Sequence, residues 1–122
     1  MIYGIGIDVL KAERVHRVLE KYGERFVEHL LMPEERVQLQ RTARPARFLA
    51  MHFAAKEAIV KALGSGISEE ISWLDIEIVN DSRGKPLVHF SDRVNASFSQ
   101  PDIELSISHC RSYAMAVALR IK

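Results

Sequence analysis

The sequence lacks most of the short patterns that indicate a metal, nucleotide or nucleophile site. It has one cysteine, which excludes an internal disulfide and is typical of a reducing compartment. It has no CxxC or HExxH motif and its five histidines are scattered, so zinc is not indicated. A Walker loop, a GxSxG elbow and a GxGxxG turn are missing as well, so common nucleotide and hydrolase sites are not indicated.

An excess of one charge and a long apolar run are also missing. The 17 basic and 16 acidic side chains leave a net charge of +1, which gives no support to nucleic-acid binding. No apolar run reaches the length of a transmembrane helix, and Asp8 and Lys11 interrupt the N-terminal one, so neither a membrane span nor a signal peptide is expected. We therefore expect a cytoplasmic protein.

What is present is the composition of one compact domain. The 122 residues are 48% hydrophobic and 27% charged, with no internal repeat or low-complexity tract. A chain of this length can bury a real core but has little to spare for separate lobes. We expect a single domain over residues 1–122.

Residues 48–66 (FLAMHFAAKEAIVKALGSG) predict one helix that is closed by Gly64 and Gly66. Nearly every face of this helix is apolar, which is typical of a buried central helix. Its polar side chains form two i,i+4 pairs, which are His52 with Lys56 and Glu57 with Lys61. On this stretch alone, an exposed Glu57–Lys61 ion pair is the favoured interpretation.

Residues 2–9 alternate strictly and predict a strand. Gly4, Gly6 and Asp8 share one face of it, and two glycines on one face indicate that something approaches the backbone closely there. The simpler alternative is that Gly4 and Gly6 admit a packed helix while Asp8 only starts a turn. Taken alone, that alternative is at least as good.

The remaining patterns predict an α+β fold in which a mainly antiparallel sheet packs against the long central helix. Three helices are expected before the central one, over residues 11–22, over 24–31 and from Pro33, followed by a loop over 42–47. A polar connection is expected over 65–72 and a turn over 80–86. Strands are expected over 73–79, with Leu74, Ile76 and Ile78 facing inward, and over 87–90, 103–108 and 113–121, with a helix over 92–98 that Ser91 caps.

The chemistry rests on three side chains. Adjacent residues near a strand end point to opposite sides, so a His109–Cys110 nucleophile pair is rejected. Asp8, Glu57 and Lys61 remain. Two carboxylates brought together repel unless a hard divalent cation lies between them, and a lysine one turn along completes a set suited to phosphoryl oxygens.

Three blocks of the chain closely resemble the holo-acyl-carrier-protein synthases, the small bacterial type of 4′-phosphopantetheinyl transferase. They are GIGIDVLKAERV at residues 4–15, FAAKEAIVKALGSG at 53–66 and SISHCRSYAMAVAL at 106–119, with GKP at 84–86 between the last two. The similarity spans essentially the whole chain, and the acidic motif followed by KEAxxKA is specific.

The resemblance implies that the phosphopantetheine arm of coenzyme A is transferred to a serine of apo-acyl carrier protein, for fatty acid biosynthesis. It implies Mg²⁺, or Mn²⁺, held by Asp8 and Glu57, with these two residues and Lys61 as the catalytic set. It also implies a homotrimer with coenzyme A in the cleft between neighbouring subunits.

Further residues are assigned by position in the family pattern. The residues expected to bind coenzyme A are Lys61, His109, His52, Gly64 and Ser65. Of these, His109 is expected near the 3′-phosphate of the nucleotide. By position, Arg14 faces the carrier protein. It forms a basic row on the first helix with Arg17 and Lys21, and we expect the row to bind that protein, although such a row is usually only a solvated helix face and spacing cannot decide.

Two positions depart from the family pattern. His52 stands where the family commonly has arginine, and Ser65 stands where it has threonine. The first change predicts a weaker, pH-dependent phosphate contact, and the second is expected to be harmless. The alternative to an enzyme is a non-catalytic module that binds acyl carrier protein or coenzyme A, against which the intact Asp8, Glu57 and Lys61 argue.

Overall fold

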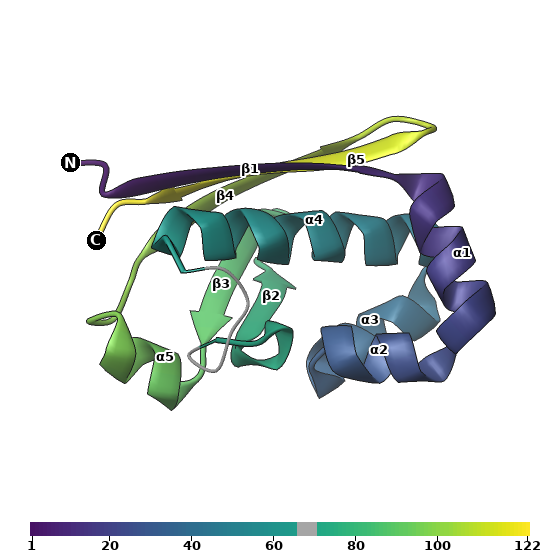
Figure 1. Cartoon of the computed structure of the whole chain (residues 1–122), viewed down its shortest axis with the longest axis horizontal. Coiled ribbons are helices and arrows are strands. Elements are labelled where there is room, and N and C mark those ends of the chain that lie inside the picture. Colours follow the sequence, from purple (N-terminus) through teal and green to yellow (C-terminus); the bar gives the residue numbers. More distant parts are fainter. Residues whose placement is uncertain (66–70) are drawn as a thin grey trace.

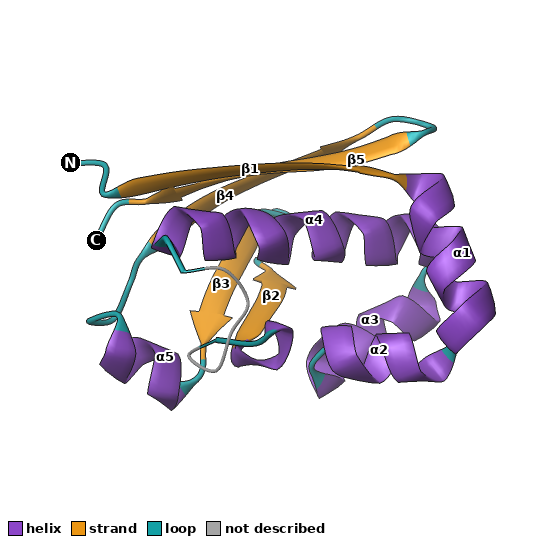
Figure 2. Cartoon of the chain, viewed as in Figure 1, coloured by secondary structure: helices purple, strands orange, loops and turns teal. Residues whose placement is uncertain are grey.

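The structure, a computed structural model, describes residues 1–65 and 71–122. Figures 1 and 2 show how its elements are arranged. They follow one another as β1 (Gly4–Lys11), α1 (Ala12–Tyr22), α2 (Glu24–Leu30), α3 (Pro33–Arg41), α4 (Pro45–Leu63), the 3₁₀ turn η1 (Trp73–Asp75), β2 (Ile76–Asn80), β3 (Pro86–Phe90), α5 (Asp92–Ser97), β4 (Ile103–His109) and β5 (Tyr113–Arg120). No helix among the described residues is long and apolar enough to cross a membrane.

Helix α4 lies at the centre of the molecule, which confirms the predicted α+β fold (Figure 1). A sheet in the order β1-β5-β4, with antiparallel pairing throughout, covers one side of the helix. The hairpin β2–β3 and helices α2 and α3 lie on its other side (Figure 1). The helix is apolar on nearly every face because both sides are covered, and its buried small residues include Ala50, Ala54, Ala55, Ala58 and Ala62. The strands form two separate sheets within the described residues, rather than the single sheet that the pattern suggested.

Helix α4 begins earlier than the sequence suggested. The predicted loop over residues 42–47 is confirmed only over 42–44, because Pro45 is the first residue of the helix. Proline is well suited to that position, since its fixed φ is helical and its missing N–H would have had no partner there. The predicted end is confirmed at Gly64, which takes a left-handed φ of 83° and donates its N–H to Val60 and Lys61. Gly66 and most of the polar connection after it lie outside the described residues.

The stretch after that connection also differs from its prediction. Residues Trp73–Asp75 form a 3₁₀ turn instead of the start of a strand, and the Leu74 side chain is 41% exposed rather than facing inward. The cause is a local cap, because the Asp75 carboxylate accepts the Ser72 N–H at 2.8 Å. The strand β2 then follows the predicted alternation. The predicted cap of α5 is confirmed, since Ser91 Oγ accepts the Val94 N–H.

The two glycines of β1 allow strand and helix to come into backbone contact. A Cβ added at Gly4 would overlap the carbonyl oxygen of Ala62, and one added at Gly6 would overlap that of Ala58. The simpler interpretation of the glycines is therefore correct, because the group that approaches the strand is helix α4. The same interpretation assigned Asp8 to the start of a turn, and this part is wrong. Asp8 lies within the strand, where it pairs with Ala116 of β5.

The outer face of the three-stranded sheet is apolar and exposed along β1 and β5, whereas β4 presents Glu104, Ser106 and Ser108 on that side. Its members alternate with the residues that face α4, and the exposed large ones are Ile5 (60%), Ile7 (50%), Val9 (52%), Tyr113 (41%) and Met115 (40%). In β5 the opposite face consists of buried Ala114, Ala116 and Ala118, as expected for a strand packed closely by a helix. We call the outer set the apolar sheet face.

Candidate active site

Asp8 and Lys61 meet where β1 crosses α4. Lys61 Nζ donates to Asp8 Oδ1 at 3.1 Å and to the carbonyl oxygen of Ile7 at 2.9 Å. The Asp8 side chain is 18% exposed and the Lys61 side chain 51%, so the pair is open to solvent on one side. The interpretation of Glu57 and Lys61 as an isolated surface ion pair is wrong, since Lys61 turns to the strand.

Glu57 lies one helical turn before Lys61 and has a partner of its own. Its Oε1 accepts the indole N–H of Trp73 at 3.0 Å. Among the residues that the structure describes, Oε2 of Glu57 and Oδ2 of Asp8 take no hydrogen bond, and no third metal-binding side chain joins them. Carboxylate oxygens without a partner suit Mg²⁺, which keeps several waters and binds through one or two protein carboxylates plus substrate phosphates. The residues present therefore fit that ion.

His52 and Lys56, the other predicted pair, point into the interior. Both reach Glu35 of α3, which is 1% exposed. Lys56 Nζ lies 2.8 Å from Glu35 Oε1, and His52 Nε2 lies 3.5 Å from Glu35 Oε2. Lys56 also donates to the carbonyl oxygens of Leu30 at 2.6 Å and Trp73 at 3.1 Å, so every proton of its ammonium group is bonded. This cluster joins α2, α3 and η1 to the central helix.

The environment of His52 does not favour the predicted contact with nucleotide phosphate. The ring stacks on Phe48, and its Nδ1 donates to the Phe48 carbonyl oxygen at 3.1 Å. Burial lowers the pKa of His52 to about 4, so the ring is neutral near pH 7. A neutral ring facing a buried carboxylate is a poor anion ligand, and we leave His52 out of the proposed nucleotide site. Burial also lowers the pKa of Lys56, against which the Glu35 carboxylate acts.

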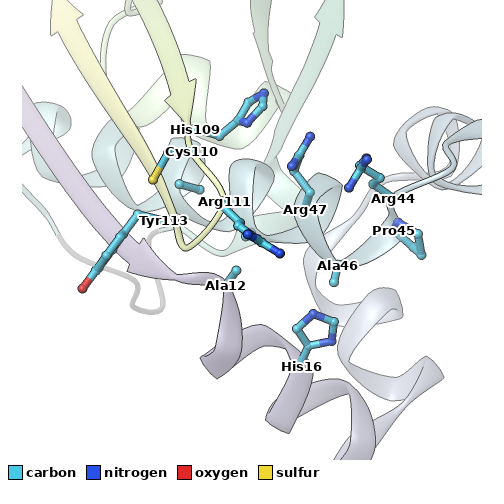
Figure 3. A pocket seen from close by; sticks show the side chains of 12 residues that line it. Ala12, His16, Arg44, Pro45, Ala46, Arg47, His109, Cys110, Arg111 and Tyr113 are labelled. Carbon is cyan, nitrogen blue, oxygen red and sulfur yellow. The ribbon is translucent and has the colours of Figure 1, made fainter.

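His109 lies at a cavity of about 280 Å³ that is rich in basic side chains (Figure 3). The basic members come from three parts of the chain, namely His16 of α1, Arg44 and Arg47 at the start of α4, and His109 and Arg111 at the β4–β5 connection. We call this the cationic cavity. Of these five side chains, sequence reasoning found only His109. Arg44 and Arg47 were assigned to a loop, and no spacing linked His16 or Arg111 to a common site. Figure 3 also shows His109 and Cys110 pointing to opposite sides, in agreement with the rejected nucleophile pair.

The basic row of α1 is exposed as expected, but its members have different surroundings. Arg14 borders a small apolar groove formed by Leu10, Val15, Val18, Phe26 and Phe53. Arg17 is paired with Glu13 at 2.9 Å, and the Lys21 ammonium lies 5.2 Å from the centre of the Tyr22 ring. Arg14 thus combines a charge with neighbouring apolar surface, which the other two do not share to the same degree. Gly64 and Ser65, the other predicted site residues, form the end of α4 beyond Lys61.

The sequence is similar to that of a known enzyme family. Residues 4–118 match the model of the 4′-phosphopantetheinyl transferase superfamily. The chain is 46% identical over 119 residues to a holo-[acyl-carrier-protein] synthase of Protochlamydia amoebophila, covering 98% of each sequence.

Solved structures agree with this match. The crystal structure of a holo-[acyl-carrier-protein] synthase from Neisseria meningitidis is 34% identical with a TM-score of 0.94, covering 100% of both chains. A Helicobacter pylori holo-[acyl-carrier-protein] synthase, solved in complex with coenzyme A, is 34% identical with a TM-score of 0.87. That match covers 95% of this chain and 98% of the other.

Proposed function

Because the chain belongs to the 4′-phosphopantetheinyl transferase superfamily, we propose that it transfers 4′-phosphopantetheine from coenzyme A to a serine of apo-acyl carrier protein. Adenosine 3′,5′-bisphosphate is the second product, and the holo-carrier serves fatty acid biosynthesis in the cytoplasm. The whole chain acts as one transferase domain. The observation that carries this proposal is the meeting of Asp8 and Lys61 beside Glu57, across the β1–α4 contact.

The residues of this site have separable tasks. Asp8 and Glu57 would hold Mg²⁺, which supplies positive charge to the pyrophosphate of coenzyme A. The serine oxygen forms a bond to the phosphorus that carries the pantetheine arm, and the bond from that phosphorus to the bridging oxygen breaks. Lys61 stabilises the negative charge that the leaving bisphosphate gains. We assign the uptake of the serine proton to solvent water on the open side of the site, because Oε2 of Glu57, which has no partner among the described residues, is the oxygen left for the metal.

Mass spectrometry of apo-acyl carrier protein tests the proposal directly. After incubation with this protein, coenzyme A and Mg²⁺, the carrier is expected to gain the mass of one phosphopantetheine arm. A carrier or coenzyme A that binds without any mass gain would instead support a non-catalytic binding module.

The cationic cavity is proposed to hold the 3′-phosphate of the nucleotide. Arg111→Ala and His109→Ala are each expected to weaken coenzyme A binding by about tenfold, since a hydrogen bond to a charged group contributes roughly 1.5–3 kcal/mol. Dephospho-coenzyme A lacks that phosphate, so its affinity is expected to change little. Isothermal titration with both ligands measures the difference, and Cys110→Ser, in the same wall, is the control. Equal losses for the two ligands would show that these side chains are structural.

The carrier protein is proposed to dock on α1, because carrier proteins are acidic and the exposed row there is basic. Arg14→Glu is expected to raise the KM for carrier protein by roughly tenfold at low ionic strength, with a smaller effect in salt and none on coenzyme A affinity. Arg17→Glu and Lys21→Glu, in the same row, are expected to have smaller effects, and Arg17 is already engaged by Glu13. Steady-state kinetics at two salt concentrations measure the change. An unaltered KM for Arg14→Glu would mean that the carrier docks elsewhere.

The apolar sheet face is proposed to be covered by further copies of this chain in a homotrimer. Soluble monomers rarely expose a continuous apolar surface of this kind. Tyr113 belongs both to this face and to the wall of the cationic cavity, so a neighbouring subunit seated on the face lies next to the nucleotide site. This continuity supports coenzyme A binding between subunits.

Sedimentation velocity tests the assembly. The protein is expected to sediment as a trimer, and Met115→Glu on the middle strand of the sheet is expected to shift it toward monomer. Leu74→Glu is the matched control, because Leu74 is 41% exposed, like Met115 at 40%, but lies away from the sheet. A monomeric parent protein, or a Met115→Glu variant that stays trimeric, would contradict the proposed interface.

A further inference from the structure

Trp73 connects the site carboxylate Glu57 to the buried interior. Its indole N–H donates to Glu57 Oε1 at 3.0 Å, and its carbonyl oxygen accepts from Lys56 Nζ at 3.1 Å. Two consecutive residues of α4 thus bind the two ends of one tryptophan. Lys56 is fully buried, whereas Glu57 lies on a partly exposed face, so the tryptophan spans from the core to the site.

The ring of Trp73 is also held by aromatic packing. It lies 5.4 Å from the Phe53 ring, centre to centre, and Phe53 in turn lies 6.3 Å from the ring of Phe26. Phe53 is one turn before Glu57 on the same helix. The indole is therefore fixed by its backbone, by its ring face and by its hydrogen bond, and it cannot turn away from Glu57 without losing other contacts.

We propose that Trp73 is a positioning residue that fixes the Glu57 carboxylate for metal binding. The proposal rests on the proposed function, in which Glu57 is a ligand of Mg²⁺. A free glutamate side chain loses rotamer freedom when a ligand orders it, and this loss weakens binding of the ligand. The Trp73 hydrogen bond orders Glu57 in advance and leaves Oε2 available, so less freedom is lost when the metal binds. Groups that hydrogen-bond to metal ligands in this way commonly change metal affinity by about 10–100-fold when they are removed.

The test is a titration of the full-length protein with Mn²⁺ in the presence of coenzyme A, followed by the electron paramagnetic resonance signal of free Mn²⁺. Trp73→Phe keeps an aromatic ring against Phe53 but removes the donor. It is expected to bind Mn²⁺ about tenfold or more weakly than the parent protein. Transfer activity of the variant is expected to recover toward the parent value at high Mg²⁺, with an unchanged KM for coenzyme A. Leu74→Ala, at the exposed neighbouring position, is the control.

A second substitution separates the donor from the shape of the ring. Trp73 is the only tryptophan of the chain, so growth of a tryptophan auxotroph on 3-benzothienylalanine replaces this residue alone with an isostere that has sulfur in place of N–H. The analogue protein decides the matter if Trp73→Phe does not fold. It is expected to melt close to the parent temperature and to show the same loss of Mn²⁺ affinity.

The outcomes distinguish this proposal from the function itself. Parent-like Mn²⁺ affinity in both altered proteins, with normal transfer by the parent protein, would overturn the role of Trp73 and leave the proposed function intact. A lower transfer rate at every Mg²⁺ concentration, with unchanged Mn²⁺ affinity, would also overturn it. A parent protein that transfers nothing and binds no Mn²⁺ beside coenzyme A would overturn both.

Discussion

Asp8→Asn and Glu57→Gln are each expected to lower kcat/KM for transfer by at least about a hundredfold, because each removes one charged ligand of an ion that contributes several kcal/mol to the transition state. Both changes preserve side-chain volume, so circular dichroism and melting temperature are expected to stay close to those of the parent protein. Losing the Asp8–Lys61 ion pair costs little stability, since Lys61 is half exposed.

Two controls make this expectation specific. Glu77→Gln changes a carboxylate of β2 whose ion-pair neighbour is His89, and it is expected to leave transfer unchanged. Addition of excess chelator to the parent protein is expected to stop the reaction, and Mg²⁺ or Mn²⁺ is expected to restore it better than Ca²⁺, which prefers more ligands and looser geometry. Transfer that continues in chelator would refute the metal assignment.

The second large effect concerns stability. Lys56→Met is expected to lower the free energy of unfolding by about 3–5 kcal/mol, because it leaves the buried Glu35 carboxylate without its cation. Urea denaturation at one fixed protein concentration measures the change, since an assembly makes apparent stability depend on concentration. Lys85→Met is the matched control. It breaks an ion pair with Glu104 whose side chains are about half exposed, and it is expected to cost at most about 1 kcal/mol.

A double variant separates the charge from the packing. Lys56→Met combined with Glu35→Leu removes both buried charges, and it is expected to recover much of the loss seen for Lys56→Met alone. Equal stability of the single variant and the parent protein would mean that the Glu35 carboxylate tolerates burial without Lys56. The other bonds to Glu35, from the N–H groups of Met32 and Ile78, would then be sufficient for it.

The sequence predicted those features that depend on neighbouring residues, and it did not predict contacts between distant elements. The alternation of β1 and the apolar character of α4 were local patterns, and both elements formed, although β1 covers Gly4–Lys11 instead of residues 2–9 and α4 begins at Pro45 instead of residue 48. The partners of Lys61 and Lys56 were not predictable from spacing, because each lies in another element. On a helix every lysine has an i,i+4 neighbour, so spacing always offers a partner. In the structure Lys61 pairs with Asp8 and Lys56 pairs with Glu35 instead.

The cationic cavity was also not predicted, because its side chains come from distant parts of the chain. Arg44 and Arg47 are close in sequence to Pro45, and once Pro45 was taken as part of a loop nothing tied them to His109. The first turn of helix α4 reaches the β4–β5 connection because the sheet runs along the helix (Figure 1). The family resemblance did name Asp8, Glu57 and Lys61, yet it gave no sign of Trp73, which the 3₁₀ turn places against Glu57.

The position of β5 has a consequence for how the chain reaches its native state. This strand follows the other described strands in the sequence, and it lies between β1, the first of them, and β4. Strand β1 can therefore settle on α4 through its glycines but cannot gain a strand partner until β5 has been synthesised. Contacts between the two ends of a chain are slow to form, and unpaired strand edges favour aggregation. We expect chains truncated before residue 113 to collapse around α4 yet to remain short-lived, because the edge of β1 stays open.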